Sequence, residues 1–114
     1  MAASIDVEAL ANLLRDAAKA EILPRFRRLG DGDIRAKSEA SDLVTDADEA
    51  AERMIKAEVS RLAPGSLFVG EESVAADPAL LARLADVEKA VVVDPIDGTY
   101  NFASGIGAFG VMAA

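Results

Sequence analysis

One stretch, Asp94 to Phe102, constrains the fold of this chain more than any other. It reads Asp-Pro-Ile-Asp-Gly-Thr-Tyr-Asn-Phe and follows Val91–Val93, an apolar run that predicts a short buried strand. Asp94 and Asp97 therefore stand at the end of this strand, and Gly98 provides the freedom for a sharp turn into a helical turn. Carboxylates there can hold a divalent cation, and free backbone N–H groups can hold a phosphate. The alternative is that Asp97 and Gly98 only form a hairpin turn between two strands.

The composition narrows the chemistry. The 114 residues are 52% hydrophobic, which indicates one small globular domain rather than a disordered chain. The 20 acidic residues against 12 basic ones give a net charge of −8, which argues against nucleic acids and anionic membranes as partners. A binding site rich in carboxylates also repels phosphate esters unless bound cations reverse the local charge. Because the chain has no Cys and no His, hydrolysis by these residues would have to use a water activated by metal.

The nine residues from Asp94 to Phe102 resemble the metal-binding signature of the inositol monophosphatase family, whose superfamily contains lithium-sensitive, magnesium-dependent sugar and nucleotide phosphatases. Residues 42–48 and 70–73 resemble two further patterns of this family. The resemblance implies a layered α/β (α+β) fold of mixed sheets with helices between them. It covers nearly the whole chain but only the front half of the family's domain. We therefore expect residues 1–114 to be the N-terminal part of one such domain, with the C-terminal half absent.

Periodicity and capping cues predict helices that alternate with short strands. Three helices are expected: from Ser4 to about Leu29 with a kink at Pro24, from Thr45 to about Leu62, and from Asp77 to about Asp86. Strands are expected at residues 34–37, 67–69 and 91–93, and residues 106–114 read as the start of another buried strand. Apart from the last of these helices, the residues between Glu71 and Asp94 read as an ordinary connection.

The resemblance implies a set of metal ligands. Glu71, Asp94 and the backbone carbonyl of Ile96 would hold one metal ion, and Asp94 and Asp97 would share a second. Glu71 would therefore be both a metal ligand and a catalytic residue. A donor set made only of oxygens suits Mg²⁺ and disfavours zinc, so Mg²⁺ is the expected cofactor.

The resemblance also implies roles in catalysis and phosphate binding. Thr99, oriented by Asp48, would align a water for in-line attack on the phosphorus. Asp97 and the backbone amides of Gly98 and Thr99 would contact the substrate, and Lys37 matches a family lysine on a loop near the metals. Structural alternatives stay open for two of them: Asp48 also reads as a helix-capping acid, and Lys37 as a solvated loop lysine.

These features lead to a hypothesis of a Mg²⁺-dependent phosphomonoesterase acting on inositol monophosphate or a similar small polyol phosphate. One alternative is a nucleotide bisphosphate phosphatase, but Asn101 favours the inositol-type branch because that other branch typically has Glu there. A further alternative is an inactive fragment that only folds and associates. A calcium-binding loop at residues 31–33 is rejected, because its sixth position is Ala36 and no Glu closes it.

The sequence also leads to expectations about location and assembly. Asp6 and Glu8 interrupt the first residues, so no secretory signal is predicted and a cytoplasmic location is expected. The full-length protein is expected to be a homodimer that binds a small phosphate ester, without nucleic acid or membrane partners. Residues 106–114 are apolar throughout and read as a strand whose neighbours are missing. The resembled family also takes a further Asp and most substrate contacts from its later half. We therefore expect the 114 residues alone to be inactive.

Overall fold

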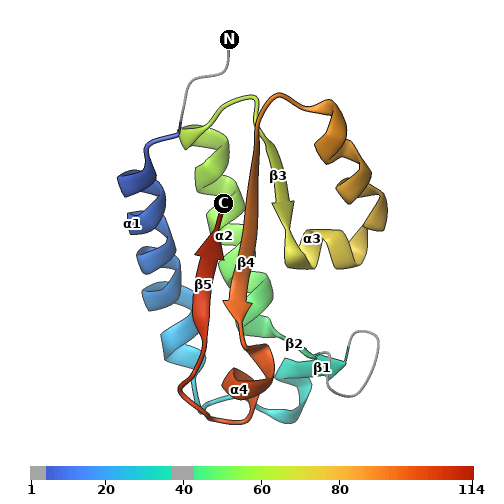
Figure 1. Ribbon diagram of the computed structural model, residues 1–114. Coiled ribbons are helices and arrows are strands. Elements are labelled where there is room, and N and C mark those ends of the chain that lie inside the picture. Colours follow the sequence, from blue (N-terminus) through green and yellow to red (C-terminus); the bar gives the residue numbers. More distant parts are fainter. Residues whose placement is uncertain (1–4, 37–42) are drawn as a thin grey trace.

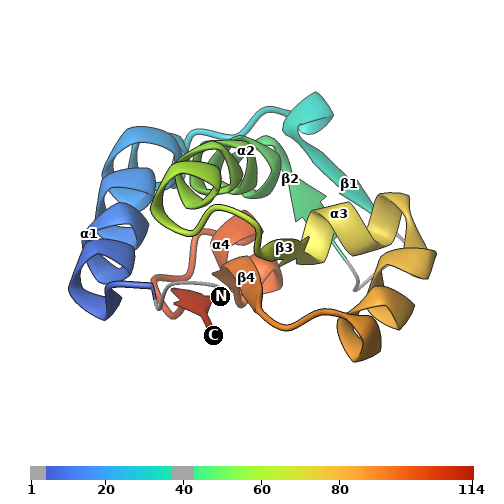
Figure 2. The ribbon, with the colours of Figure 1, turned by 90° about the horizontal axis from the view of Figure 1, so that it is seen from above.

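Two helices, α1 (Val7–Ala17) and α2 (Asp46–Leu62), lie side by side on one face of a three-stranded sheet (Figure 1). The computed structural model describes residues 5–36 and 43–114. Lys37, a predicted substrate-binding residue, lies outside the described residues. Viewed from above, both helices lie on the same side of the sheet (Figure 2). This mixture of helices and sheets agrees with the α/β class predicted from the sequence.

The sheet has a mixed topology. Its order is β3 (Leu67–Gly70), β4 (Ala90–Asp97) and β5 (Gly110–Ala113), with β3 parallel and β5 antiparallel to β4. The other elements are a π-helical segment (Ala18–Ile22), 3-10 helices (Leu23–Arg25, Asp31–Asp33 and Pro78–Asp86), an antiparallel pair of strands, β1 (Ile34–Ala36) and β2 (Leu43–Thr45), and two short helices, α3 (Glu71–Ala76) and α4 (Thr99–Ala103).

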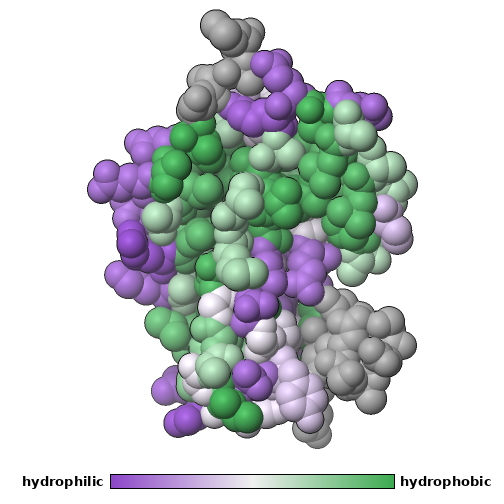
Figure 3. Space-filling model, viewed as in Figure 1, coloured by the Kyte–Doolittle hydropathy of each residue, from purple (hydrophilic) through white to green (hydrophobic). Residues whose placement is uncertain are grey.

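The valine run forms the centre of β4, but it is buried on one side only. Val91 and Val93 pack with Leu13 of α1 and with Ile55 of α2. Val92 points to the opposite face and is 41% exposed, because successive side chains of a strand alternate between faces. The prediction of a buried strand is therefore wrong for Val92, and the face of the sheet turned away from the helices is open. Figure 3 shows broad apolar surface on this face.

A β-bulge changes this alternation near the end of β4. Asp94 pairs with Met112 and Asp97 pairs with Gly110, so β4 has one more residue than β5 between these two pairs. Pro95, which has no N–H to donate, lies within the bulge. The extra residue lets Ile96 enter the core while Asp97 is exposed. Asp94 and Asp97 thus lie within the strand rather than beyond its end, which corrects the sequence-based boundary.

The second helix follows its prediction closely. Thr45 and Asp48 form the expected capping box, and α2 ends at the expected Leu62. Its buried positions repeat at helical spacing and include Ala47, Ala51, Ile55 and Val59. Both β4 and α1 contact this helix, so α2 forms a central part of the core.

The first and third predicted helices differ from expectation. Asp6, not Ser4, caps α1, because its carboxylate accepts hydrogen bonds from the backbone N–H groups of Glu8 (2.9 Å) and Ala9 (3.3 Å). Helical structure ends at Arg25 in a π-helical and then a 3-10 segment, a few residues before the expected Leu29. Residues 78–86 form a 3-10 helix rather than an α-helix, and the side chain of Asp77 makes no capping hydrogen bond.

An aromatic cluster holds α4 at the end of the sheet, directly after β4. The rings of Phe26, Phe102 and Phe109 have centroid separations of 5.0–5.8 Å. Phe102 is fully buried and packs with Ile22 and Ile96 in a second core cluster. This packing places the first residue of α4 beside the N-terminus of α2. Within the described residues, no helix is long and apolar enough to cross a membrane.

Candidate active site

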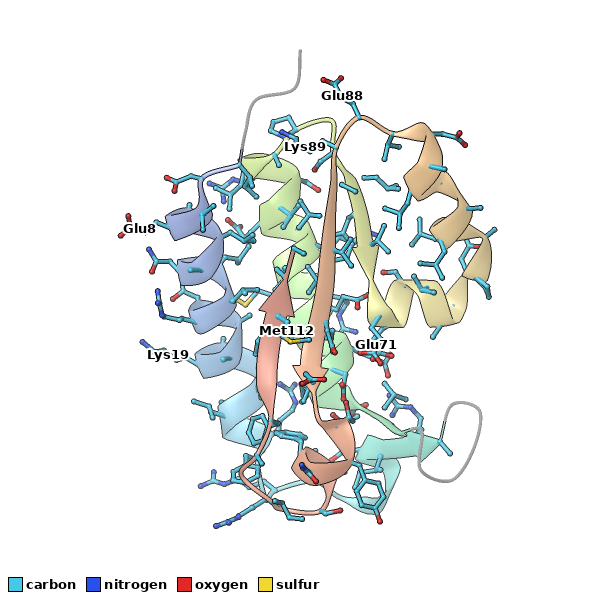
Figure 4. The ribbon with its side chains drawn as sticks, viewed as in Figure 1. Glu8, Lys19, Glu71, Glu88, Lys89 and Met112 are labelled. Atoms are coloured by element: carbon cyan, nitrogen blue, oxygen red, sulfur yellow. The ribbon has the colours of Figure 1, made fainter. Side chains whose placement is uncertain are left out.

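The parallel pairing of β3 and β4 brings two of the predicted acids together. Gly70, the last residue of β3, pairs with Val93, so Glu71 and Asp94 are the next residues along the two neighbouring strands. Glu71 lies beside the lower part of β4 (Figure 4). Two stretches separated by more than twenty residues therefore supply carboxylates to one edge of the sheet, as the sequence predicts.

Asp94 is in an environment that disfavours its negative charge. The pKa of this carboxyl is raised to about 7, most strongly by burial, then by a hydrogen bond with Glu71 and by the negative charges of Glu71, Asp97 and Asp48. Its Oδ1 atom is buried and receives no hydrogen bond from any described residue. Buried oxygens are normally paired, so an orphaned carboxylate oxygen among like charges fits a bound cation.

The donor set fits Mg²⁺ in its chemistry but is not preassembled. All candidate ligands are oxygens, and the carbonyl of Ile96 accepts a hydrogen bond from Thr99 Oγ1 (2.9 Å) while keeping a second lone pair. Among the described residues, however, no three His, Cys, Asp or Glu side chains are grouped closely enough to hold a metal ion. Glu71 and Asp94 are thus adjacent, whereas Asp97 acts on Asp94 only through its charge.

Asp48 and Thr99 meet at the centre of the site. Thr99 Oγ1 donates to Asp48 Oδ1 at 2.9 Å. The other carboxylate oxygen, Oδ2, accepts hydrogen bonds from the backbone N–H (2.8 Å) and the hydroxyl (2.6 Å) of Thr45. Asp48 is therefore a helix cap and a partner of Thr99 at the same time, so the two interpretations of this residue are compatible.

Burial also has the largest effect on the pKa of Asp48. It raises the pKa of this carboxyl, while the hydrogen bonds from Thr45 and Thr99 act in the opposite direction and the charge of Glu71 raises the pKa slightly further. The negative charge of Glu71 therefore raises the pKa values of both Asp48 and Asp94. A cation bound beside Glu71 would lower both pKa values.

Gly98 makes the turn that leads from β4 into α4. Its φ is +91°, in the left-handed region, and a Cβ atom there would lie 3.0 Å from the carbonyl oxygen of Ala108. Thr99 is the first residue of α4, so its N–H and that of Gly98 lack partners within the helix. The hairpin interpretation is wrong, because β4 and β5 are separated by α4 and residues 104–109. Asn101 joins α4 to this connection, donating from Nδ2 to the carbonyl of Ala108 (2.9 Å).

An open hollow of about 280 Å³ adjoins the acids on the uncovered face of the sheet. Glu71 and Asp94 line one part of it, but Val74, Leu81 and Val92 form much of its wall. Such an apolar wall does not suit a phosphate or a polyol. The chemistry therefore belongs to the strand ends and not to this hollow.

The sequence interpretation missed one buried acid next to the site. Glu52 of α2 is 5% exposed and accepts hydrogen bonds from the first turn of α3. A signal was available, since Glu52 follows Asp48 by four residues and interrupts the apolar side of the helix. The helical state of residues 71–76 was missed as well.

With this geometry established, the comparisons with known proteins identify the family. Residues 5–114 match the inositol monophosphatase family. This chain belongs to that family. The inositol-1-monophosphatase SuhB of Mycobacterium tuberculosis is 42% identical over 82 residues, which cover 72% of this chain and 28% of that protein. The histidinol-phosphatase of Streptomyces coelicolor is 34% identical over 105 residues, which cover 92% of this chain and 36% of that protein.

A solved structure confirms the inositol-monophosphatase-like α/β fold. The IMPase of Thermotoga maritima superposes with a TM-score of 0.74 at 27% identity, covering 95% of this chain and 38% of that one. This member of the inositol monophosphatase family therefore spans only about a quarter to two-fifths of the length of these relatives. The relatives are named as phosphatases, and this chain has the fold of the Thermotoga maritima IMPase over the part that it shares with that protein.

Proposed function

We propose that this chain forms part of a Mg²⁺-dependent phosphomonoesterase that hydrolyses inositol monophosphate or a similar small polyol phosphate. The observation that carries the proposal is the hydrogen bond between Thr99 and Asp48, formed beside the carboxylates that follow β3 and lie in β4. The names of the relatives support the substrate class, because inositol-1-monophosphatases are among them.

The metal would be held by Glu71, Asp94, Asp97 and the carbonyl of Ile96. The orphaned Oδ1 atom of Asp94, and the burial and negative neighbours that raise the pKa of this carboxyl, support this assignment. When bound, Mg²⁺ would supply the positive charge that an anionic substrate needs and would make a nearby water more acidic. Without it, the net charge of −8 would oppose the approach of a phosphate ester.

Thr99 would orient the attacking water. A hydroxyl has one hydrogen to donate, and Thr99 directs it to Asp48 Oδ1 or to the Ile96 carbonyl, both at 2.9 Å. A lone pair of Thr99 Oγ1 is then free to accept a hydrogen bond from the water. The lone pairs of the water's oxygen would thereby be directed away from Thr99 and towards the substrate. Asp48 is held in place by Thr45, so this acceptor is in position before the substrate binds.

The substrate's phosphate would contact Asp97 through the metal and the backbone amides of Gly98 and Thr99 directly. Lys37, predicted to assist in the same role, lies outside the described residues and stays a prediction. The cytoplasmic location and the homodimer expected from the sequence also stay predictions.

Histidinol phosphate is a second candidate substrate. The Streptomyces coelicolor histidinol-phosphatase matches 92% of this chain, a larger share than the Mycobacterium tuberculosis relative matches. Both substrates are small phosphomonoesters, so the same acids, Thr99 and amides would serve either one.

The test is phosphate release by the purified protein that carries this chain, with and without MgCl₂. Inositol 1-phosphate, histidinol phosphate and a nucleotide 3′,5′-bisphosphate would be compared by kcat/KM. We expect hydrolysis to require Mg²⁺, to favour inositol 1-phosphate and to be inhibited by lithium, as the family resemblance implies. No Mg²⁺-dependent release from any phosphomonoester would contradict the proposal, and a preference for histidinol phosphate would select the second candidate.

A further inference from the structure

Glu52 connects α2 to the segment that carries Glu71. Its Oε1 atom accepts a hydrogen bond from the backbone N–H of Glu72 (2.8 Å). Its Oε2 atom accepts two more, from the backbone N–H (2.8 Å) and the hydroxyl (2.6 Å) of Ser73. A carboxylate that is 5% exposed and accepts three hydrogen bonds is firmly held, because each bond compensates for the water it lost on burial.

These bonds replace a missing helix cap. The N-cap position of α3 is Gly70, which has no side chain to accept hydrogen bonds from the first turn. Glu52 reaches across from another helix to bind the N–H groups at the second and third positions of α3. The residue between the cap and these two positions is Glu71, so its backbone is fixed from both sides.

Gly70 is required for this approach. A Cβ atom built on Gly70 would lie 2.2 Å from Cδ of Glu52 and 2.4–2.5 Å from its two carboxylate oxygens. No larger residue fits unless the carboxylate moves away. The glycine at the end of β3 and the acid on α2 therefore form one matched pair.

The same helix holds both halves of the site. Asp48 binds Thr99, and Glu52, one turn further along and about 6 Å up the helix axis, binds the segment of Glu71. The spacing between the predicted water-orienting residue and the predicted metal ligand is thus set by consecutive turns of α2. A rigid helix sets such a spacing more accurately than loops do.

We infer that Glu52 is a positioning residue that holds Glu71 in its metal-binding place, an assignment that rests on the proposed function. Both carboxylate oxygens of Glu52 are taken by backbone and hydroxyl donors of α3, so we do not assign it as a metal ligand. Removing it would leave every ligand present but would loosen the backbone that carries one of them. Partners of this kind typically change metal affinity by about 10- to 100-fold when they are removed.

Glu52→Gln is the direct test, because an amide has one acceptor oxygen for the three donors and keeps the side-chain size. Glu58→Gln is the matched control: Glu58 lies on the same helix and pairs only with Arg61 among the hydrogen bonds described (2.6 Å). The purified protein is titrated with MgCl₂ by calorimetry, and the amide resonances of Glu72 and Ser73 are followed by NMR without metal.

We expect Glu52→Gln to shift both amide resonances and to weaken Mg²⁺ binding about tenfold or more, while Glu58→Gln changes neither. Gly70→Ala should produce the same result from the other side of the contact. Wild-type Mg²⁺ affinity in a folded Glu52→Gln protein would overturn the inference. If the Glu52 variant does not fold, Gly70→Ala takes its place, because the added Cβ displaces the Glu52 carboxylate, and unchanged Mg²⁺ affinity there would overturn the inference instead.

The outcomes separate the two proposals. If the wild-type protein itself binds no Mg²⁺, the proposed function fails and the inference about Glu52 fails with it. If the wild-type protein binds Mg²⁺ and the Glu52 variant binds it equally well, only the inference fails.

Discussion

Thr99 on α4 donates a hydrogen bond to Asp48 at the start of α2, across 51 residues of sequence. The same carboxylate caps α2 through Thr45. One buried side chain thus connects the stability of a helix with the orientation of a hydroxyl at the candidate active site, and substitution can separate the two effects.

Asp48→Asn should reduce turnover on the order of 10²-fold while changing the free energy of unfolding by under about 1 kcal/mol. The amide oxygen can keep the two bonds from Thr45. The amide nitrogen would then donate a hydrogen bond to Thr99 Oγ1. This bond would occupy the lone pair of Thr99 that we assign to the attacking water. Steady-state kinetics beside thermal melts measure the two effects, and a lower melting temperature with unchanged turnover would leave Asp48 as a cap alone.

Asp94→Asn and Glu71→Gln should each abolish most Mg²⁺-dependent phosphatase activity and leave the fold intact. Each replaces a charged oxygen ligand by a neutral group of similar size, and losing one electrostatic contact in an active site costs on the order of 10²-fold or more. Asp94→Asn should also raise the melting temperature of the metal-free protein, because it relieves repulsion with Glu71. Near-normal turnover at saturating Mg²⁺ would refute the ligand assignment.

The pKa of Asp94 predicts how the stability of the metal-free protein depends on pH. The folded state keeps this carboxyl protonated up to about pH 7, whereas the unfolded chain releases the proton near the ordinary value of 3.8. The folded state therefore binds more protons between these values, and its stability falls as pH rises from about 4 to 7. Asp48, whose pKa is also raised, adds a change of the same sign.

Chelator-treated protein melted at several pH values between 4 and 8 tests this, with Asp94→Asn as the comparison. We expect a shallower decline in the variant. Equal slopes for the two proteins would show that Asp94 does not titrate in this range.

We predict that the 114 residues expressed alone associate and release no phosphate. On the open face of the sheet, Val92 and Met112 are 41% and 50% exposed, and Leu81 of the neighbouring 3-10 helix is 53% exposed. Among the described strands, β5 also has a free edge. Substituting Val92→Thr and Met112→Gln together should raise the monomer fraction measured by light scattering. A monomeric, active 114-residue protein would contradict this prediction.

Local patterns were predictable from the sequence, and contacts between distant residues were not. The capping box of Thr45 and Asp48 spans four residues, so its chemistry can be read directly and α2 has the expected ends. The resemblance placed Asp48 next to Thr99, which no local rule does. By contrast, the role of Glu52 depends on residues 20 and 21 positions away, and no pattern along the helix shows which donors it meets.

The limits of β4 were missed for a similar reason. The bulge depends on how β4 pairs with β5, so Val91–Val93 alone could not show that the strand continues through Pro95 to Asp97. At Asp77 the local cue was present but insufficient: Asp-Pro started a helical segment, yet of the 3-10 type and without a side-chain cap. The sequence predicts Ser4 as the cap of the first helix because Asp6 and Glu8 suit a first helical turn, but Asp6 is itself the cap.

The arrangement of α2 has a consequence for folding kinetics. Forming the helix requires only neighbouring residues, but its bonds to Ser73 and Thr99 close loops of 21 and 51 residues. We therefore expect the helix to form early and both bonds to appear only after β3 and β4 have paired. Early intermediates would then lack an assembled cation site, and Mg²⁺ would slow the unfolding of the native protein without accelerating its folding.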